Sequence, residues 1–117
     1  MQYLLMIYAA ESANPKAGTA EHDKMMQGYT ELAQELEAKG LMKGGNALDE
    51  VATATTVRVR NGKAQTLDGP FAETKEQLGG FFLLECKDLD EAIQYAGKVP
   101  SAQFGSIEIR PVISCGG

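Results

Sequence analysis

The order of apolar and polar positions along the chain predicts six β-strands. They are expected at residues 2–9, 41–48, 53–60, 63–68, 79–87 and 106–113. The first and the fifth are apolar on both alternating faces, which is typical of central strands covered on both sides. The third and fourth flank Asn61-Gly62, the strongest short-range signal for a two-residue hairpin turn.

In two other segments the apolar residues recur with the period of an α-helix. Thr19 is a suitable N-cap for a helix that runs to about Lys39 and stops at Gly40. Asp88 is a suitable N-cap for a second helix, which ends just before Pro100.

The predicted order is therefore β-α-β, a hairpin, and β-α-β again. Two such units form an α+β, ferredoxin-like split β-α-β sandwich with an extra hairpin, in which both helices cover one face of an antiparallel sheet. The first strand is apolar on both faces, so either Leu4, Met6 and Tyr8 or their alternating neighbours face away from the helices. A second copy of the chain is the simplest cover, and we expect a homodimer packed sheet against sheet.

Composition narrows the class of protein. The 117 residues suit one domain, 1–117, and 44% apolar and 23% charged residues are ordinary globular values. No apolar run approaches the ~20 residues of a spanning helix, so we expect no membrane association. A net charge of −5 without a basic block argues against nucleic-acid binding. Cys86 and Cys115 without a secretion signal predict reduced thiols in a cytoplasm.

The register of the hairpin predicts which of its two faces carries the Asp68 side chain. A two-residue turn at Asn61-Gly62 pairs Val57 with Thr66 and Thr55 with Asp68, so Asp68 shares the apolar side of the hairpin. A carboxylate that points toward an interior needs a donor or a cation. The alternative is that Asp68 caps its own turn by accepting N–H bonds around Gly69.

The one histidine begins a stripe on the first helix. His22, Met25, Tyr29, Leu32 and Leu36 are spaced three and four apart, so they form the face packed on the sheet. Either His22 is a half-buried residue bonded to the backbone, or it is a general acid or base, since imidazole titrates near neutral pH.

The block "DGPFAETKEQLGGF" within residues 52–112, together with "YLLMIY" near the start, resembles the DGPF-domain proteins, a branch of the YCII-related family. The resemblance implies a dimeric α+β barrel and a cytoplasmic bacterial protein, often encoded near extracytoplasmic-function sigma factors. It also implies kinship with small lyase-like enzymes, including a dehydrochlorinase of a chlorinated hydroquinone, and a His–Asp site carried here onto His22 and Asp68. The tail "SCGG" departs from the pattern, and Cys115 has no assigned role.

Three functions remain open. The chain is a cofactor-independent lyase or isomerase acting on a small molecule, a non-catalytic ligand sensor or protein partner, or a purely structural dimer. In the first case His22 moves a proton and Asp68 orients it. A pocket for the ligand is then expected from Tyr8, Gly69, Pro70, Phe71 and Phe82. No metal is expected, because one histidine and two distant cysteines do not supply a zinc ligand set.

Overall fold

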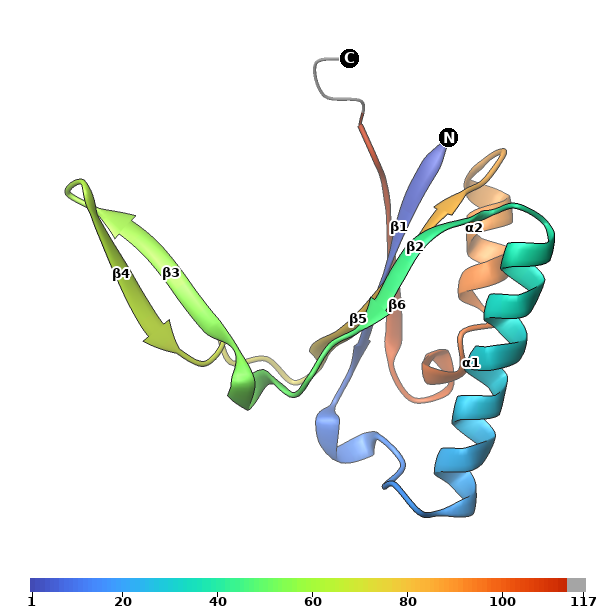
Figure 1. The fold of residues 1–117 in the computed structure, drawn as a ribbon, viewed down its shortest axis with the longest axis horizontal. Coiled ribbons are helices and arrows are strands. Elements are labelled where there is room, and N and C mark those ends of the chain that lie inside the picture. The colour runs from blue at the N-terminus through green and yellow to red at the C-terminus, as the bar shows by residue number, and fades with distance from the viewer. Residues whose placement is uncertain (114–117) are drawn as a thin grey trace.

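A computed structural model describes residues 1–113 and has the predicted order of elements (Figure 1). The strands are β1 (Gln2–Ala9), β2 (Met42–Ala47), β3 (Thr55–Arg60), β4 (Lys63–Asp68), β5 (Gln77–Glu85) and β6 (Ser106–Pro111). The helices are α1 (Ala20–Ala38) and α2 (Leu89–Ala96), and three short 3₁₀ turns are η1 (Glu11–Ala13), η2 (Val51–Thr53) and η3 (Pro100–Gln103). The α+β prediction is confirmed, and Cys115 lies outside the described residues.

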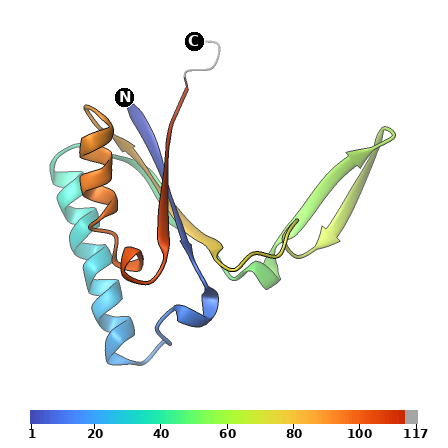
Figure 2. The ribbon, with the colours of Figure 1, turned by 180° about the vertical axis from the view of Figure 1, so that it is seen from behind.

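The main sheet has four strands in the order β2-β5-β1-β6, and each neighbouring pair is antiparallel. This is the ferredoxin-like order, in which two β-α-β units interlock. Both helices lie on the same face of the sheet, as the views from front and back show (Figures 1 and 2). The other face of the sheet, which we call the helix-free face, is not covered by any helix or strand of residues 1–113.

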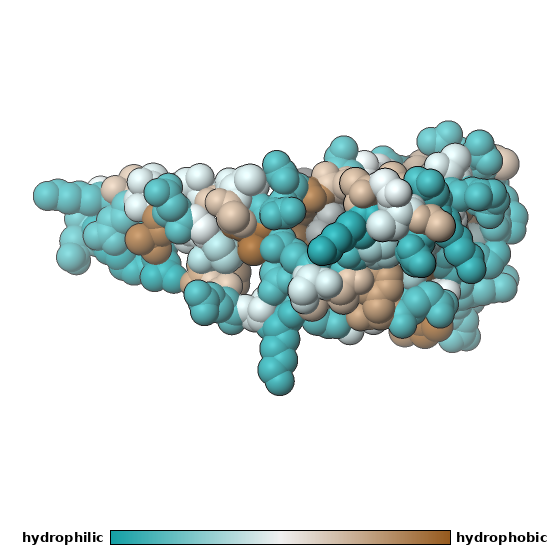
Figure 3. All heavy atoms as spheres, turned by 90° about the horizontal axis from the view of Figure 1, so that it is seen from below, coloured by the Kyte–Doolittle hydropathy of each residue, from teal (hydrophilic) through white to brown (hydrophobic). Residues whose placement is uncertain are grey.

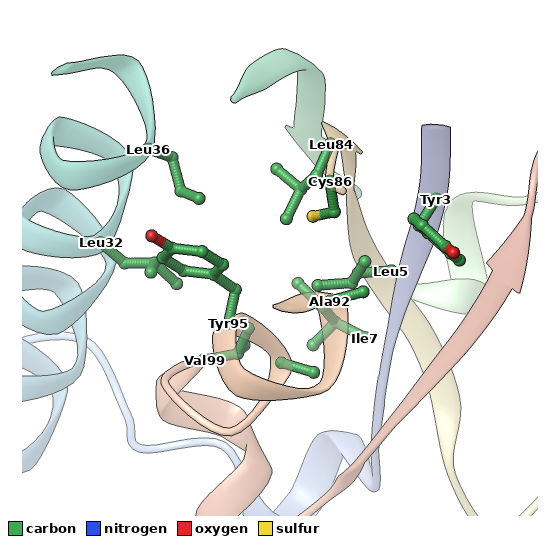
Figure 4. Close-up of a cluster of buried hydrophobic side chains, with 11 residues drawn as sticks. Tyr3, Leu5, Ile7, Leu32, Leu36, Leu84, Cys86, Ala92, Tyr95 and Val99 are labelled. Atoms are coloured by element: carbon green, nitrogen blue, oxygen red, sulfur yellow. The ribbon is translucent and has the colours of Figure 1, made fainter. Parts of the chain in front are cut away.

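The sequence pattern of β1 explains both faces. Its odd-numbered residues are buried against the helices, where Leu5 is completely inaccessible. They join buried residues of β5, α1 and α2 in one core, formed by Tyr3, Leu5, Ile7, Leu32, Leu36, Leu84, Cys86, Ala92, Tyr95, Ala96 and Val99 (Figure 4). The even-numbered residues Leu4 and Met6 are half-buried on the helix-free face, opposite Leu83 and Phe81 of β5. The expectation that central strands are apolar on both faces is thus confirmed.

Helix α1 begins where the sequence predicts. The hydroxyl oxygen of Thr19 accepts a hydrogen bond from the backbone N–H of His22, so one of the unpaired donors of the first turn is satisfied. The predicted stripe does face the sheet, but its burial is uneven: Leu32 and Leu36 are buried, whereas His22 and Tyr29 are half-buried. The N-terminal half of α1 therefore covers a space that side chains do not fill.

Strands β3 and β4 form a separate two-stranded sheet that projects away from the body on the side opposite the helices (Figures 1 and 2). We call residues 55–68 the arm. Asn61 and Gly62 have positive φ angles of 53° and 74°, as a type I′ turn requires, and the predicted register is confirmed. All residues of β4 are exposed, and the Cα radius of gyration of 16.2 Å exceeds the roughly 13 Å typical of a compact chain of this length.

The base of the arm is closed by hydrogen bonds. The N–H of Gly69 donates to the carbonyl oxygen of Ala54 at 2.7 Å, and the Thr56 hydroxyl donates to the carbonyl oxygen of Gly69 at 2.8 Å. Gly69 has a φ of 97°, which favours glycine at this turn. The arm therefore leaves the body through a defined, paired base.

Candidate functional site

A cavity of about 850 Å³ lies between the N-terminal half of α1 and the sheet. Its size is within the usual range for small-molecule sites. Apolar side chains from α1 and the sheet form most of its walls, among them Ile7, Ala9, Met25, Ala33 and Phe82. On the sheet side, Gly45 lets the Phe82 ring lie close to β2, because a Cβ atom on Gly45 would lie 2.9 Å from Cδ1 of Phe82.

The position of α1 over this cavity depends on one close contact. A Cβ atom on Gly28 would lie 2.9 Å from Cγ of Pro100, closer than real Cβ contacts allow. Glycine at this position lets α1 approach η3 directly. The same approach brings Tyr29 next to Ser101.

Tyr29 and Ser101 place a polar pair in the apolar wall. The Tyr29 hydroxyl lies 2.6 Å from the hydroxyl oxygen of Ser101, and Ser101 is buried. The pair has two O–H donors and its mutual bond uses one, so one O–H is available to a ligand. The Tyr29 ring lies against Phe82, with ring centroids 6.3 Å apart. Burial raises the pKa of Tyr29, and its hydrogen bonds with Ser101 oppose that shift, so the hydroxyl stays protonated at neutral pH.

Charged side chains surround the mouth of the cavity. Among the described residues that line it are the carboxylates of Glu11, Asp49 and Glu50 and one cation, Lys16. The rim is therefore acidic, and it disfavours an anionic ligand over a neutral one.

Glu11 also holds the rim together. Its carboxylate accepts a hydrogen bond from the N–H of Val51 in η2 at 2.8 Å. Its own N–H donates to the side-chain oxygen of Gln77 at 3.0 Å, and the Gln77 amide donates to the carbonyl oxygen of Thr74 at 2.6 Å. Glu11 thus links η1 to the two segments that lead into and out of the arm.

Of the residues predicted for a site, Phe82 is the one that lines this cavity. Tyr8 lies on the helix-free face, because it has the same parity as Leu4 and Met6 in β1. Pro70 and Phe71 are exposed in the connection between β4 and β5, and Phe71 is 76% accessible. The structure therefore does not gather the predicted ligand-binding residues in one pocket.

His22 and Asp68 are not brought together within the chain. His22 is in the first turn of α1, whereas Asp68 ends β4, and the arm and α1 lie on opposite sides of the sheet (Figure 1). The expectation that Asp68 is at least partly buried and hydrogen-bonded is wrong for the single chain. Its side chain is exposed and makes no hydrogen bond within residues 1–113, because the arm on which it lies leaves the body.

Tyr29 and Ser101 were missed as a site. The helical spacing places Tyr29 in the buried stripe, and its hydroxyl is the signal that this stripe has a polar position at its centre. Ser101 carries no such signal, since it meets Tyr29 only through the tertiary fold.

Two further observations concern metals and membranes. Within residues 1–113, no three His, Cys, Asp or Glu side chains gather as a metal-ligand set. None of the helices in this part of the chain is both long and apolar enough to cross a bilayer.

Comparison with known proteins identifies the family to which this chain belongs. An uncharacterized protein, R00369 of Rhizobium meliloti (strain 1021), is 34% identical over 114 residues, which cover 96% of this chain and 92% of that protein. The solved structure of 5-chloro-2-hydroxyhydroquinone dehydrochlorinase (TftG) from Burkholderia phenoliruptrix AC1100, in complex with 2,5-dihydroxybenzoquinone, matches with a TM-score of 0.48 and 15% identity. That match covers 97% of this chain and 94% of the other, but at this similarity it says nothing about what this chain acts on. The family model of the YCII-related domain matches residues 1–115, and the chain belongs to the YCII-related family, as its sequence predicts.

Proposed function

We propose that this protein binds a small, largely apolar, uncharged molecule in the cavity beneath α1. The observation that carries the proposal is the Tyr29–Ser101 hydroxyl pair, held at 2.6 Å in an apolar wall with one O–H left to donate. A few convergent polar groups in an otherwise apolar pocket are typical of small-molecule sites. The acidic rim makes a carboxylate-bearing ligand a poor fit.

Three naphthalene probes of different charge test this proposal. In two-dimensional NMR titrations at pH 7, uncharged 2-naphthol should shift the amide signals of Tyr29, Ala33 and Phe82. Anionic 2-naphthoate should bind at least about tenfold more weakly, because its charge meets an apolar wall and an acidic rim. Binding of cationic 2-naphthylmethylamine measures how strongly the acidic rim attracts a positively charged ligand. Equal binding of 2-naphthoate at the same residues would overturn the proposed ligand class.

Two variants locate the binding. Tyr29→Phe keeps the ring against Phe82 and removes one hydroxyl, so the 2-naphthol Kd should rise by about fivefold. Ala33→Leu narrows the cavity and should weaken binding, while Ala38→Leu, an exposed position on the same helix, is the matched control. Unchanged binding in Ala33→Leu would exclude this cavity as the site.

A second candidate is a cofactor-independent acid/base lyase or isomerase, favoured by the protonated Tyr29 hydroxyl in the cavity wall. The probe is 2-tetralone in D₂O. The Tyr29 O–H would donate to the ketone oxygen and stabilise the enolate, while a base from the solvent removes an α-proton and deuterium is returned from the solvent. Exchange above the buffer rate that is lost in Tyr29→Phe supports catalysis. Binding without exchange supports the alternative, a non-catalytic ligand sensor or regulatory partner in sigma-factor signalling.

His22 and Asp68 stay a predicted proton-transfer pair, and the same assay tests them. Since neither lines the cavity, His22→Gln and Asp68→Asn should leave tetralone exchange unchanged if the Tyr29 O–H stabilises the enolate. A loss of exchange in both variants would restore the pair and require Asp68 to come from another copy of the chain.

We also propose that the chain acts as a homodimer joined through the helix-free face, which would complete a dimeric α+β barrel. Leu4, Met6 and Tyr8 are half-buried on this face, and Leu83 and Phe81 lie beside them on β5. A central apolar strip of this kind supports association with a second sheet.

We propose a cytoplasmic location. Cys86 is a free, buried thiol, and burial raises its pKa, so the thiolate is disfavoured. An unpaired structural cysteine of this kind suits a reducing compartment.

A further inference from the structure

The arm has no strand pairing with the rest of residues 1–113. Its two strands bond to each other and belong to a sheet of their own. An isolated two-stranded hairpin is marginally stable at best in water. An arm with a complete register therefore needs a surface to lie on.

The two faces of the arm differ in chemistry. Val57, Val59 and Ala64 share one face through the pairing of β3 with β4, and Val57 and Val59 are 60% and 62% exposed. Arg58, Arg60 and Lys63 lie on the other face. Apolar side chains show on the arm as well as on the body in the view from below (Figure 3).

The charge of the arm is opposite to that of the body. The whole chain carries a net charge of −5. The arm contains Arg58, Arg60, Lys63 and Asp68, a net +2, so the remaining residues carry −7. Opposite net charges attract the arm of one copy to the body of another and would repel an arm from a second arm.

The direction of the arm is fixed at its base. The Gly69–Ala54 hydrogen bond closes the two strands, and the Glu11 carboxylate fixes Val51 just before β3. A segment held in one orientation loses little conformational entropy when it binds. The arm is thus preorganised for binding.

We propose that the arm is a clasp for a second copy of this chain, and this inference rests on the proposed homodimer. The arm projects on the same side as the helix-free face (Figure 1), so a second copy seated on that face meets the arm as well. The valine face of the arm packs on the second copy. The basic residues lie on the opposite face of the arm, outside this contact, and their charge attracts the acidic body of the second copy at longer range.

Charge reversal on the arm tests the clasp. The double variant Arg58→Glu, Arg60→Glu changes exposed positions and should preserve the fold, while the dimer Kd measured by analytical ultracentrifugation rises at least about tenfold. The control Lys24→Glu, Lys87→Glu makes the same change of charge on the body and should not weaken the dimer. The wild-type Kd should rise with salt, and that of the arm variant should rise less.

A crosslink identifies what the arm touches. A photoreactive benzoylphenylalanine at Val59, in a mixture of ¹⁵N-labelled and unlabelled chains, should give crosslinks between heavy and light copies. Crosslinks confined to one chain, or an arm variant that dimerises as tightly as wild type, would overturn the clasp and leave the homodimer standing. A wild-type chain that stays monomeric removes both the homodimer and the clasp, while the binding of 2-naphthol remains a separate question.

Discussion

The hydroxyl group of Tyr29 sits in the middle of the helix face that packs on the sheet, where Leu32 and Leu36 are fully apolar. A polar group at such a position is tolerated when a partner satisfies it, and Ser101 does so from 72 residues away. The same arrangement keeps one O–H for a ligand. At the scale of single residues, the Tyr29–Ser101 pair thus has two roles. It satisfies the polar groups of both side chains, and it leaves one O–H to contact a ligand.

The shifted pKa of Tyr29 predicts a pH dependence of stability. An unfolded tyrosine loses its proton near pH ~10, whereas burial makes folded Tyr29 keep it to higher pH. Between these values the unfolded state binds fewer protons, so the free energy of unfolding falls as pH rises. Urea unfolding from about pH 9 to 11 should show a steeper decline for wild type than for Tyr29→Phe. Parallel declines would contradict the shift.

At the scale of elements, the close contact of α1 with η3 positions the cavity. Gly28→Ala would ordinarily strengthen a helix by ~1 kcal/mol. Here the new Cβ meets the Pro100 ring, so we expect a loss of roughly 1 kcal/mol in urea unfolding instead. Lys24→Ala, an exposed change on the same helix, should show no such loss. A clear gain in stability for Gly28→Ala would mean that α1 moves away without cost.

The rim of the cavity depends on Glu11. In Glu11→Ala the N–H of Val51 loses its acceptor, and its hydrogen exchange should become roughly tenfold faster. Glu11→Gln keeps a side-chain oxygen and should restore slow exchange. Glu21→Ala, on the exposed side of α1, is the control. Exchange unaffected by Glu11→Ala would show that the rim is held by other contacts.

The elements themselves were largely predictable because their signals are local. Asn61-Gly62 sets the hairpin register through two positive φ angles, and Thr19 and Asp88 cap their helices through side-chain oxygens a few residues from their partners. The cavity was not predictable in this way. It depends on Gly28 meeting Pro100 and on Tyr29 meeting Ser101, contacts between segments far apart in the chain.

At the scale of the whole molecule, the same limit explains Asp68. The turn at Asn61-Gly62 correctly predicts which face of the hairpin carries Asp68, since Thr55 does pair with Asp68. Alternation along a strand shows which residues share a face, but it does not show whether a body lies behind that face. The arm projects from the body, and Asp68 is therefore exposed.

The helix-free face predicts the state of association. Met6→Glu places a charge in its apolar strip, and burying that charge against a second sheet would cost several kcal/mol. Light scattering should then show a monomer at micromolar concentration where wild type is a dimer. Gln94→Glu adds the same charge on the exposed side of α2 and should leave the dimer intact. A wild-type monomer would contradict the proposed assembly.

The hydrogen bond between Gly69 and Ala54 has a consequence for the modularity of the chain. It holds the two ends of the arm within bonding distance, and no strand of the main sheet pairs with β3 or β4. Residues 55–68 can therefore be excised and the ends joined without opening an edge in the sheet. The arm is therefore a segment that a single insertion or deletion could add to or remove from a ferredoxin-like body. The shortened chain should keep its cavity and still bind 2-naphthol.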